Sequence, residues 1–231
     1  MIPKIIHQVW EGRKEPLPDF YIRLRKTWKE HHPDWRYEFW DGDRMDSFVN
    51  SNYPQMADIF FQYRYDVQRW DVIRYLILYK TGGMYVDFDY ECLESFDNYL
   101  SEEKCYFAME PALHRRSFEK DIYFNNALII TPPGHPFIKN IITCLQNTPV
   151  TYSESKYLDV LNSTGPLMLT GLYEKYETKA DIHLISSEQV SPWSKNEVIG
   201  YINGKVDKKM LEKQLENAIA IHYFWGSWIN D

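Results

Sequence analysis

Two carboxylates separated by one residue are the feature of this sequence with the clearest chemical potential. Asp87 and Asp89 end the apolar segment 84–89, directly behind Gly82-Gly83. Side chains at positions i and i+2 of a strand lie on the same face, so we expect both carboxylates to point the same way. Carboxylates held side by side favour a cation between them, and hard oxygen ligands suit Mn²⁺ or Mg²⁺. The pattern predicts a metal site that holds a phosphorylated ligand.

A mostly apolar segment, predicted to be a helix over 66–80, precedes this pair. Asp71 and Arg74 are charged residues within it, and their spacing of three places them on one helix face. They form either a local ion pair worth a few tenths of a kcal/mol or a pair that faces a cleft beside the metal. The sequence leaves both interpretations open.

The rest of the chain supplies the elements that must position these residues. Apolar strands are predicted at 2–10, 35–40, 84–89, 105–110, 126–131, 182–186 and 218–223, and helices at 18–32, 43–50, 54–63, 66–80, 135–146, 164–176 and 207–217. The opening strand–helix–strand order indicates parallel strands with a right-handed crossover. No repeat or linker divides the chain. We therefore expect residues 1–231 to form a single α/β domain with a mixed, mostly parallel central sheet flanked by helices.

The amino-acid composition indicates which kinds of ligand the protein can bind. The 231 residues carry a net charge of -7, which argues against a nucleic acid, because proteins that bind one usually carry a basic surface. Tyr and Trp are numerous, at 18 and 8 residues, and offer flat faces that suit stacking on sugars or bases. Segment 23–36 leans basic, which indicates a solvated helix face or a patch for anionic lipid.

The sequence also predicts a compartment. Three cysteines without a CxxC motif indicate a reducing environment. We see neither a signal peptide nor an apolar run of about 20 residues, the length a membrane span requires. The expectation is a cytoplasmic protein, with peripheral association at the inner membrane face left open. Motifs of P-loop enzymes, Rossmann oxidoreductases, zincins and α/β-hydrolases are missing from the sequence, which removes support for those classes.

Four segments, taken together and in order, resemble a known family of enzymes, the DxD sugar transferases of family 32. This family includes yeast-type initiating α-mannosyltransferases, bacterial capsule transferases and, more distantly, the catalytic domains of clostridial glucosylating toxins. The residues that carry the resemblance are the segment 2–10, Asp71 with Arg74, Gly82-Gly83 with Tyr85, Asp87 and Asp89, and His222 with Ser227 and Trp228.

The resemblance implies a GT-A fold and transfer of a hexose from a nucleotide diphosphate sugar with retention of configuration. It implies that Trp10 stacks on the nucleotide base and that Asp71 and Arg74 hold hydroxyls of the donor sugar. Tyr85 and Asp87 would contact the ribose and the metal shell. Mn²⁺ is the implied cofactor, with Mg²⁺ as an alternative, and UDP-hexoses are favoured over GDP-hexoses as donors.

The resemblance extends to the C-terminal region. Asp89 would ligate the metal directly, and His222 would add a nitrogen ligand to the oxygens of Asp87 and Asp89, a set acceptable to Mn²⁺. A histidine that ends an apolar strand can equally be a hydrogen-bonded core residue. Ser227 and Trp228 would close over the diphosphate as a lid.

The sequence indicates fewer residues for acceptor binding and for the chemical step. Asn125 and Asn126 precede a predicted strand and could reach the donor sugar or the acceptor, and Glu110 could lie in the cleft. The expected acceptor is a saccharide or a lipid-linked sugar, as in polysaccharide or capsule biosynthesis. Two other functions remain open: a non-catalytic carbohydrate-binding protein, and a DxD phosphohydrolase, which would need different residues after the second aspartate than Tyr90-Glu91.

Overall fold

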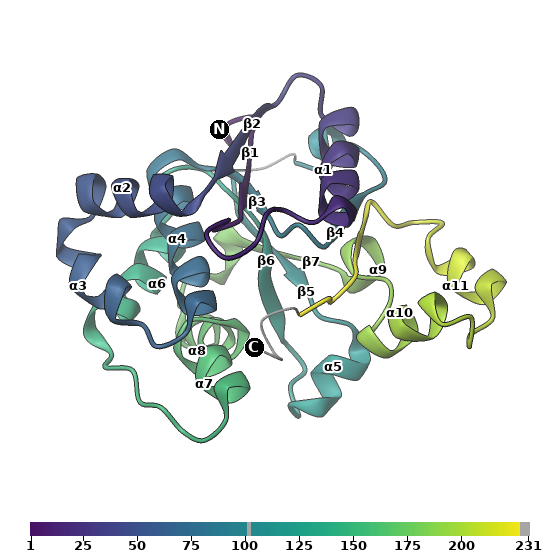
Figure 1. Ribbon diagram of the computed structural model, residues 1–231. Coiled ribbons are helices and arrows are strands. Elements are labelled where there is room, and N and C mark those ends of the chain that lie inside the picture. The colour runs from purple at the N-terminus through teal and green to yellow at the C-terminus, as the bar shows by residue number, and fades with distance from the viewer. Residues whose placement is uncertain (101–102, 227–231) are drawn as a thin grey trace.

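The computed structural model describes residues 1–100 and 103–226 (Figure 1). Its strands are β1 (Ile5–Val9), β2 (Arg36–Trp40), β3 (Gly83–Val86), β4 (Tyr90–Cys92), β5 (Cys105–Met109), β6 (Phe124–Thr131), β7 (Ile182–Ile185) and β8 (Ala220–His222). Its helices are α1 (Asp19–His31), α2 (Gly42–Asn52), α3 (Pro54–Gln62), α4 (Asp66–Thr81), α5 (Ala112–Ser117), α6 (Pro136–Asn147), α7 (Lys156–Ser163), α8 (Pro166–Lys175), α9 (Ser187–Val190), α10 (Lys195–Ile202) and α11 (Lys208–Gln214), with short 3₁₀ helices η1 (Phe96–Asn98) and η2 (Lys179–Asp181).

A six-stranded sheet in the order β2-β1-β3-β6-β5-β7 forms the centre of the molecule. Strand β1 runs parallel to β2 and β3, and β5 runs parallel to β7, whereas β6 is antiparallel to both of its neighbours. This confirms the predicted α/β class with a mixed, mostly parallel sheet flanked by helices. Strand β8 instead pairs with β4 in a separate antiparallel ribbon.

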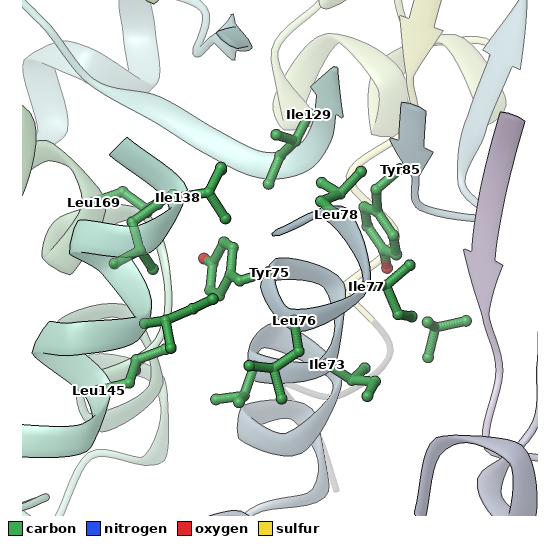
Figure 2. Close-up of a cluster of buried hydrophobic side chains, with 14 of the residues drawn as sticks. Ile73, Tyr75, Leu76, Ile77, Leu78, Tyr85, Ile129, Ile138, Leu145 and Leu169 are labelled. Carbon is green, nitrogen blue, oxygen red and sulfur yellow. The ribbon is translucent and has the colours of Figure 1, made fainter. Parts of the chain in front are cut away.

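Alternation along the central strands directs side chains into a core on each face of the sheet. Tyr85 and Ile129 point to one face, where they pack against α4, α6 and α8, as Figure 2 shows. Their neighbours Met84 and Leu128 point to the other face and pack with Trp28 of α1. Both faces are therefore covered, as expected for strands that are apolar at nearly every position.

Helix α4 is buried on almost all sides. Residues 72–78 are each less than 5% exposed, and the helix lies between the sheet and α6 (Figure 2). A helix that is apolar all round belongs in the interior. Its two charged residues, Asp71 and Arg74, are consequently inside the protein and must find partners there.

The turn between α4 and β3 requires glycine. Gly82 and Gly83 have φ values of 64° and 98°, which side-chain-bearing residues rarely adopt. A Cβ atom on Gly83 would lie 2.6 Å from the carbonyl oxygen of Ile5, so β1 and the turn approach too closely for any side chain. The predicted role of this glycine pair, positive φ after the helix, is confirmed.

Strand β3 ends earlier than the sequence pattern predicts. It stops at Val86, and Asp87 to Asp89 form a turn that leads into β4. The predicted placement of both carboxylates on one strand face is therefore wrong, and each meets different partners. Several short helices were also not predicted, notably α5 and α7, because six to eight residues give too little apolar periodicity. Among the described residues, no helix combines the length and apolar content needed to cross a membrane.

Candidate active site

A cavity of about 470 Å³ opens where α4, the ends of β3 and β6 and the C-terminal segment meet. A lined cavity of this size is expected of a site that binds a small molecule. The predicted site residues that line it are Trp10, Asp71, Arg74, Tyr85, Asp87, Asp89, Glu110, Asn125, Asn126 and His222. These residues lie up to 212 positions apart in the sequence, and the cavity brings them together.

Arg74 is the centre of the first polar network in this cavity. Its guanidinium contacts Asp71 Oδ1 at 3.0 Å through Nη2 and Asp87 Oδ1 at 3.3 Å through Nη1. Nη1 also donates to the carbonyl oxygen of Asn126 at 2.8 Å, and the guanidinium carbon lies 4.5 Å from the centre of the Tyr85 ring. The predicted ion pair and the predicted cleft location are thus both present, since Arg74 joins two carboxylates in the cavity wall.

The Asp71 carboxylate is held on both of its oxygens. Asn126 Nδ2 donates to Oδ1 and the Thr164 hydroxyl donates to Oδ2, each over 2.8 Å. Burial raises the pKa of Asp71 in spite of Arg74, whose charge works in the opposite direction. Tyr75 completes the network, because it accepts from Asn126 Nδ2 at 2.9 Å and donates to the Thr164 carbonyl at 2.8 Å.

Asp89, in the turn before β4, and His222, at the end of β8, form a second network. His222 Nε2 lies 3.4 Å from Asp89 Oδ1, and the backbone N–H of Trp225 donates to Asp89 Oδ2 at 2.9 Å. The imidazole stacks on Tyr90 with ring centres 4.2 Å apart. Burial disfavours the imidazolium, but the facing carboxylate of Asp89 outweighs this, so the pKa of His222 is raised.

These positions bear on the predicted metal site. No three His, Cys, Asp or Glu side chains are grouped closely enough to hold a metal in the part of the chain that the structure describes. The Asp87 carboxylate is held by Arg74 and by the hydroxyl of Tyr85, and a metal shared by Asp87, Asp89 and His222 stays a prediction. Asp89 and His222 alone offer an oxygen and a nitrogen side by side, which fits a cation that takes its other ligands from a bound phosphate.

The remaining predicted donor-binding residues differ in how far the structure describes them. Trp10 lines the cavity, with its ring edge against Tyr21 at 5.6 Å between centres and its Nε1 donating to the carbonyl of Glu15. Its stacking on a base stays a prediction. Ser227 and Trp228 lie outside the described residues.

A third polar group lies in the same cavity. Glu110, 6% exposed at the end of β5, accepts a hydrogen bond from Asn125 Nδ2 at 2.8 Å and a short one from His114 Nδ1. Sequence reasoning placed Glu110 in the cleft but missed His114, which lies on the unpredicted helix α5. The i, i+4 spacing of Glu110 and His114 was the available signal, and it is weak without a predicted helix.

Comparisons with known proteins agree with this geometry. Residues 18–106 match the family model described as "Glycosyltransferase sugar-binding region containing DXD motif". An inositol phosphoceramide mannosyltransferase of Schizosaccharomyces pombe is 33% identical over 180 residues, covering 78% of this chain and 47% of that protein. A mannosyl phosphorylinositol ceramide synthase of Saccharomyces cerevisiae is 30% identical over 77% of this chain and 44% of that protein. The chain thus spans about half the length of these relatives.

Solved structures support the fold. The glycosyltransferase PaToxG superposes with a TM-score of 0.57 at 17% identity, over 78% of this chain and 72% of that chain. The UDP-bound glycosyltransferase domain of the YGT toxin gives 0.56 at 9% identity, over 93% and 88%. Because the Schizosaccharomyces pombe and Saccharomyces cerevisiae relatives are at least 30% identical over more than three quarters of the chain, the chain belongs to the DxD sugar transferases of family 32, and it has the GT-A fold.

Proposed function

We propose that this protein is a retaining glycosyltransferase. It moves a hexose from a nucleotide diphosphate sugar to a saccharide or lipid-linked acceptor, with Mn²⁺ or Mg²⁺ bound beside Asp89. UDP-hexoses are favoured as donors and GDP-hexoses are the alternative. One relative described above is named as a mannosyltransferase and the other as a mannosyl phosphorylinositol ceramide synthase, so mannose is the first sugar to test.

One observation carries this proposal: the Asp71–Arg74–Asp87 network and the Asp89–His222 pair line the same cavity. The first supplies fixed hydrogen-bond acceptors and a cation for sugar and ribose hydroxyls. The second supplies an oxygen and a nitrogen ligand of the kind that holds a metal on a diphosphate. When bound, the metal neutralises negative charge that develops on the leaving diphosphate.

In this reaction the acceptor oxygen forms a bond to C1 of the hexose as the bond from C1 to the diphosphate oxygen breaks. Attack comes from the face that the diphosphate leaves, and the acceptor proton passes to the departing phosphate. Asp71 and Arg74 orient the sugar, and Asp87 with Tyr85 orients the ribose. The buried positions of Asp71 and Arg74, 4% exposed each, support such fixed roles.

The proposed setting is the synthesis of a polysaccharide or capsule at the inner face of a membrane, in the cytoplasm. What supports this setting is the resemblance to capsule transferases and the printed names of relatives that act on ceramide lipids. Peripheral association with the membrane is part of the proposal, and nucleic acid is not a proposed partner.

The test is a screen of UDP- and GDP-hexoses for release of the nucleoside diphosphate in the presence of Mn²⁺. NMR of the product from the active donor should show the same anomer as in the donor. A carbohydrate-binding protein would bind sugars but cleave no donor, and a phosphohydrolase would release inorganic phosphate from simple phosphate esters. Either result would replace the proposed function.

A further inference from the structure

The polar group around Glu110 belongs to the same cavity as the two proposed donor networks but forms no hydrogen bond with either in the described residues. The Phe224 ring joins it to the proposed metal side. That ring lies 4.7 Å from the imidazole of His114 and 3.9 Å from that of His222, measured between centres. A ligand bound at Glu110 would therefore be next to the leaving diphosphate.

The Glu110 carboxylate receives its two hydrogen bonds from His114 and Asn125. His114 accepts the backbone N–H of Lys195 at Nε2 over 3.1 Å, so its proton sits on Nδ1 and points at Glu110. The imidazole in this tautomer is neutral, and Asn125 is neutral as well. A carboxylate can accept about four hydrogen bonds, and among the described residues His114 donates one to Oε2 and Asn125 one to Oε1.

A buried carboxylate whose hydrogen-bond donors are all neutral lowers the stability of the folded protein. The free acceptor positions of Glu110 face the cavity that it lines. Hydroxyl groups of a sugar ring are donors that would fill them.

The cavity around Glu110 is lined by apolar side chains as well as by the polar residues Ser117, Ser194 and Lys195. Leu113, Phe118, Tyr123 and Tyr157 line the cavity there. Leu113 of α5 and Tyr157 of α7 are 49% and 39% exposed, which is unusual for large apolar side chains at the rim of a polar site. The two helices stand apart along the lower part of the view in Figure 1. Leu113 and Tyr157 therefore add partly exposed apolar surface to the lining of the cavity.

We propose that this half of the cavity is the acceptor subsite and that it takes a glycoside with an apolar aglycone. Glu110 accepts hydrogen bonds from hydroxyls of the acceptor sugar ring, and Leu113 and Tyr157 contact the apolar chain attached to that ring. The inference rests on the proposed function, because it assigns the second substrate of that same reaction.

The test is a ligand-observed NMR titration of the whole chain with methyl α-mannoside and hexyl α-mannoside. The wild-type protein should bind the hexyl glycoside about tenfold more tightly, because part of the five additional methylenes is buried at the rim. Glu110→Gln should weaken binding of both glycosides about tenfold, as loss of a charged hydrogen-bond acceptor predicts. Leu113→Ser should remove only the advantage of the hexyl chain.

Controls separate this role from damage to the fold or to the donor site. Ile199→Ser changes another apolar residue of 46% exposure, on α10 outside the cavity lining, and should leave both affinities as they are. Affinity for UDP is measured in parallel on each variant. Glycoside binding that Glu110→Gln leaves unchanged, or weakens only in step with UDP binding, would overturn the proposal.

Two further results are decisive. A wild-type protein that binds neither glycoside, or both equally, would overturn the proposed subsite. A wild-type protein that binds the hexyl glycoside as expected but cleaves no nucleotide sugar would support the subsite as a glycoside site and refute the proposed transferase function. Failure of the proposed acceptor subsite is therefore distinguishable from failure of the proposed transferase function.

Discussion

Thr164 and Asp71, 93 positions apart in the chain, are joined by a hydrogen bond of 2.8 Å from the threonine hydroxyl to Asp71 Oδ2. Thr164→Val keeps the side-chain shape but leaves this buried oxygen without its donor, at a cost of about 1–3 kcal/mol. We expect lower stability in denaturant unfolding. We also expect nucleotide-sugar turnover to fall about tenfold, the effect of a 1.4 kcal/mol change in barrier.

Thr164→Ser is the matched control, because serine retains the hydroxyl and loses only a methyl group. It should restore most of the turnover. If the valine variant turned over donor at the wild-type rate, Thr164 would have no part in positioning Asp71.

Arg74 should be essential to the fold as well as to the site. Arg74→Met leaves Asp71 and Asp87 without the cation that joins them. Removing one partner of a buried ion pair costs about 3–5 kcal/mol. Arg36→Met is the control, because its pair with Glu38 is 64% exposed on the arginine side and should change stability by less than about 1 kcal/mol. Equal unfolding midpoints for the two variants would contradict this account.

The Gly82-Gly83 turn offers a test of backbone constraint. Gly83→Ala places a Cβ atom 2.6 Å from the Ile5 carbonyl at a φ of 98°, and should cost about 3–5 kcal/mol from strain and overlap together. Gly204→Ala serves as the comparison, because Gly204 has a φ of 65° with no atom within 4 Å of its Cβ position. Its cost should be about 1–2 kcal/mol, from strain alone. Thermal unfolding of both variants checks the difference.

His7 should make stability depend on pH. It is 1% exposed, and burial lowers its pKa from 6.5 to about 4. Its Nδ1 accepts from Trp40 Nε1 at 3.1 Å and its Nε2 lies 3.1 Å from the Gly82 carbonyl, so both partners suit the neutral ring. As pH falls, the unfolded chain protonates His7 before the folded protein does. The contribution of neutral His7 to stability is therefore fully present above pH 6.5. It is lost as pH falls towards 4, by up to about 3 kcal/mol.

Denaturant unfolding between pH 7.5 and 4.5 measures this loss, and His7→Gln isolates it from other titrating groups. The variant is expected to be less stable at pH 7.5. Its free energy of unfolding should also change less with pH, with a slope smaller by up to about 1.4 kcal/mol per pH unit. Parallel curves for wild type and variant would mean that His7 does not titrate on unfolding.

Much of the fold followed from the sequence, because its larger elements have clear periodicity or clear stops. The segment 66–80 is mostly apolar and is followed by two glycines, and helix α4 spans 66–81. The short helices α5 and α7 lacked such a signal. The end of β3 was misjudged because Phe88 extends the apolar run past Val86, where the strand stops.

The candidate site was predicted less completely, for a different reason. Asp71 and Arg74 stood out as charges in an apolar helix, and the aspartates stood out by their spacing. Thr164 and Tyr75 had no such contrast, since a threonine before a helix and a tyrosine in an apolar helix are ordinary. Their roles arise only from contacts between α4 and the α7–α8 junction, which local patterns do not encode.

The metal dependence of donor cleavage tests the central claim most directly. Release of UDP or GDP from the active nucleotide sugar is measured after chelation and after addition of Mn²⁺, for wild type, Asp89→Ala and the control Asp58→Ala, which changes an exposed aspartate. We predict that Mn²⁺ restores turnover in wild type and in Asp58→Ala, and that Asp89→Ala is slower by at least about 100-fold. Full turnover by Asp89→Ala, or no cleavage of any UDP- or GDP-hexose by the wild type, would contradict the claim.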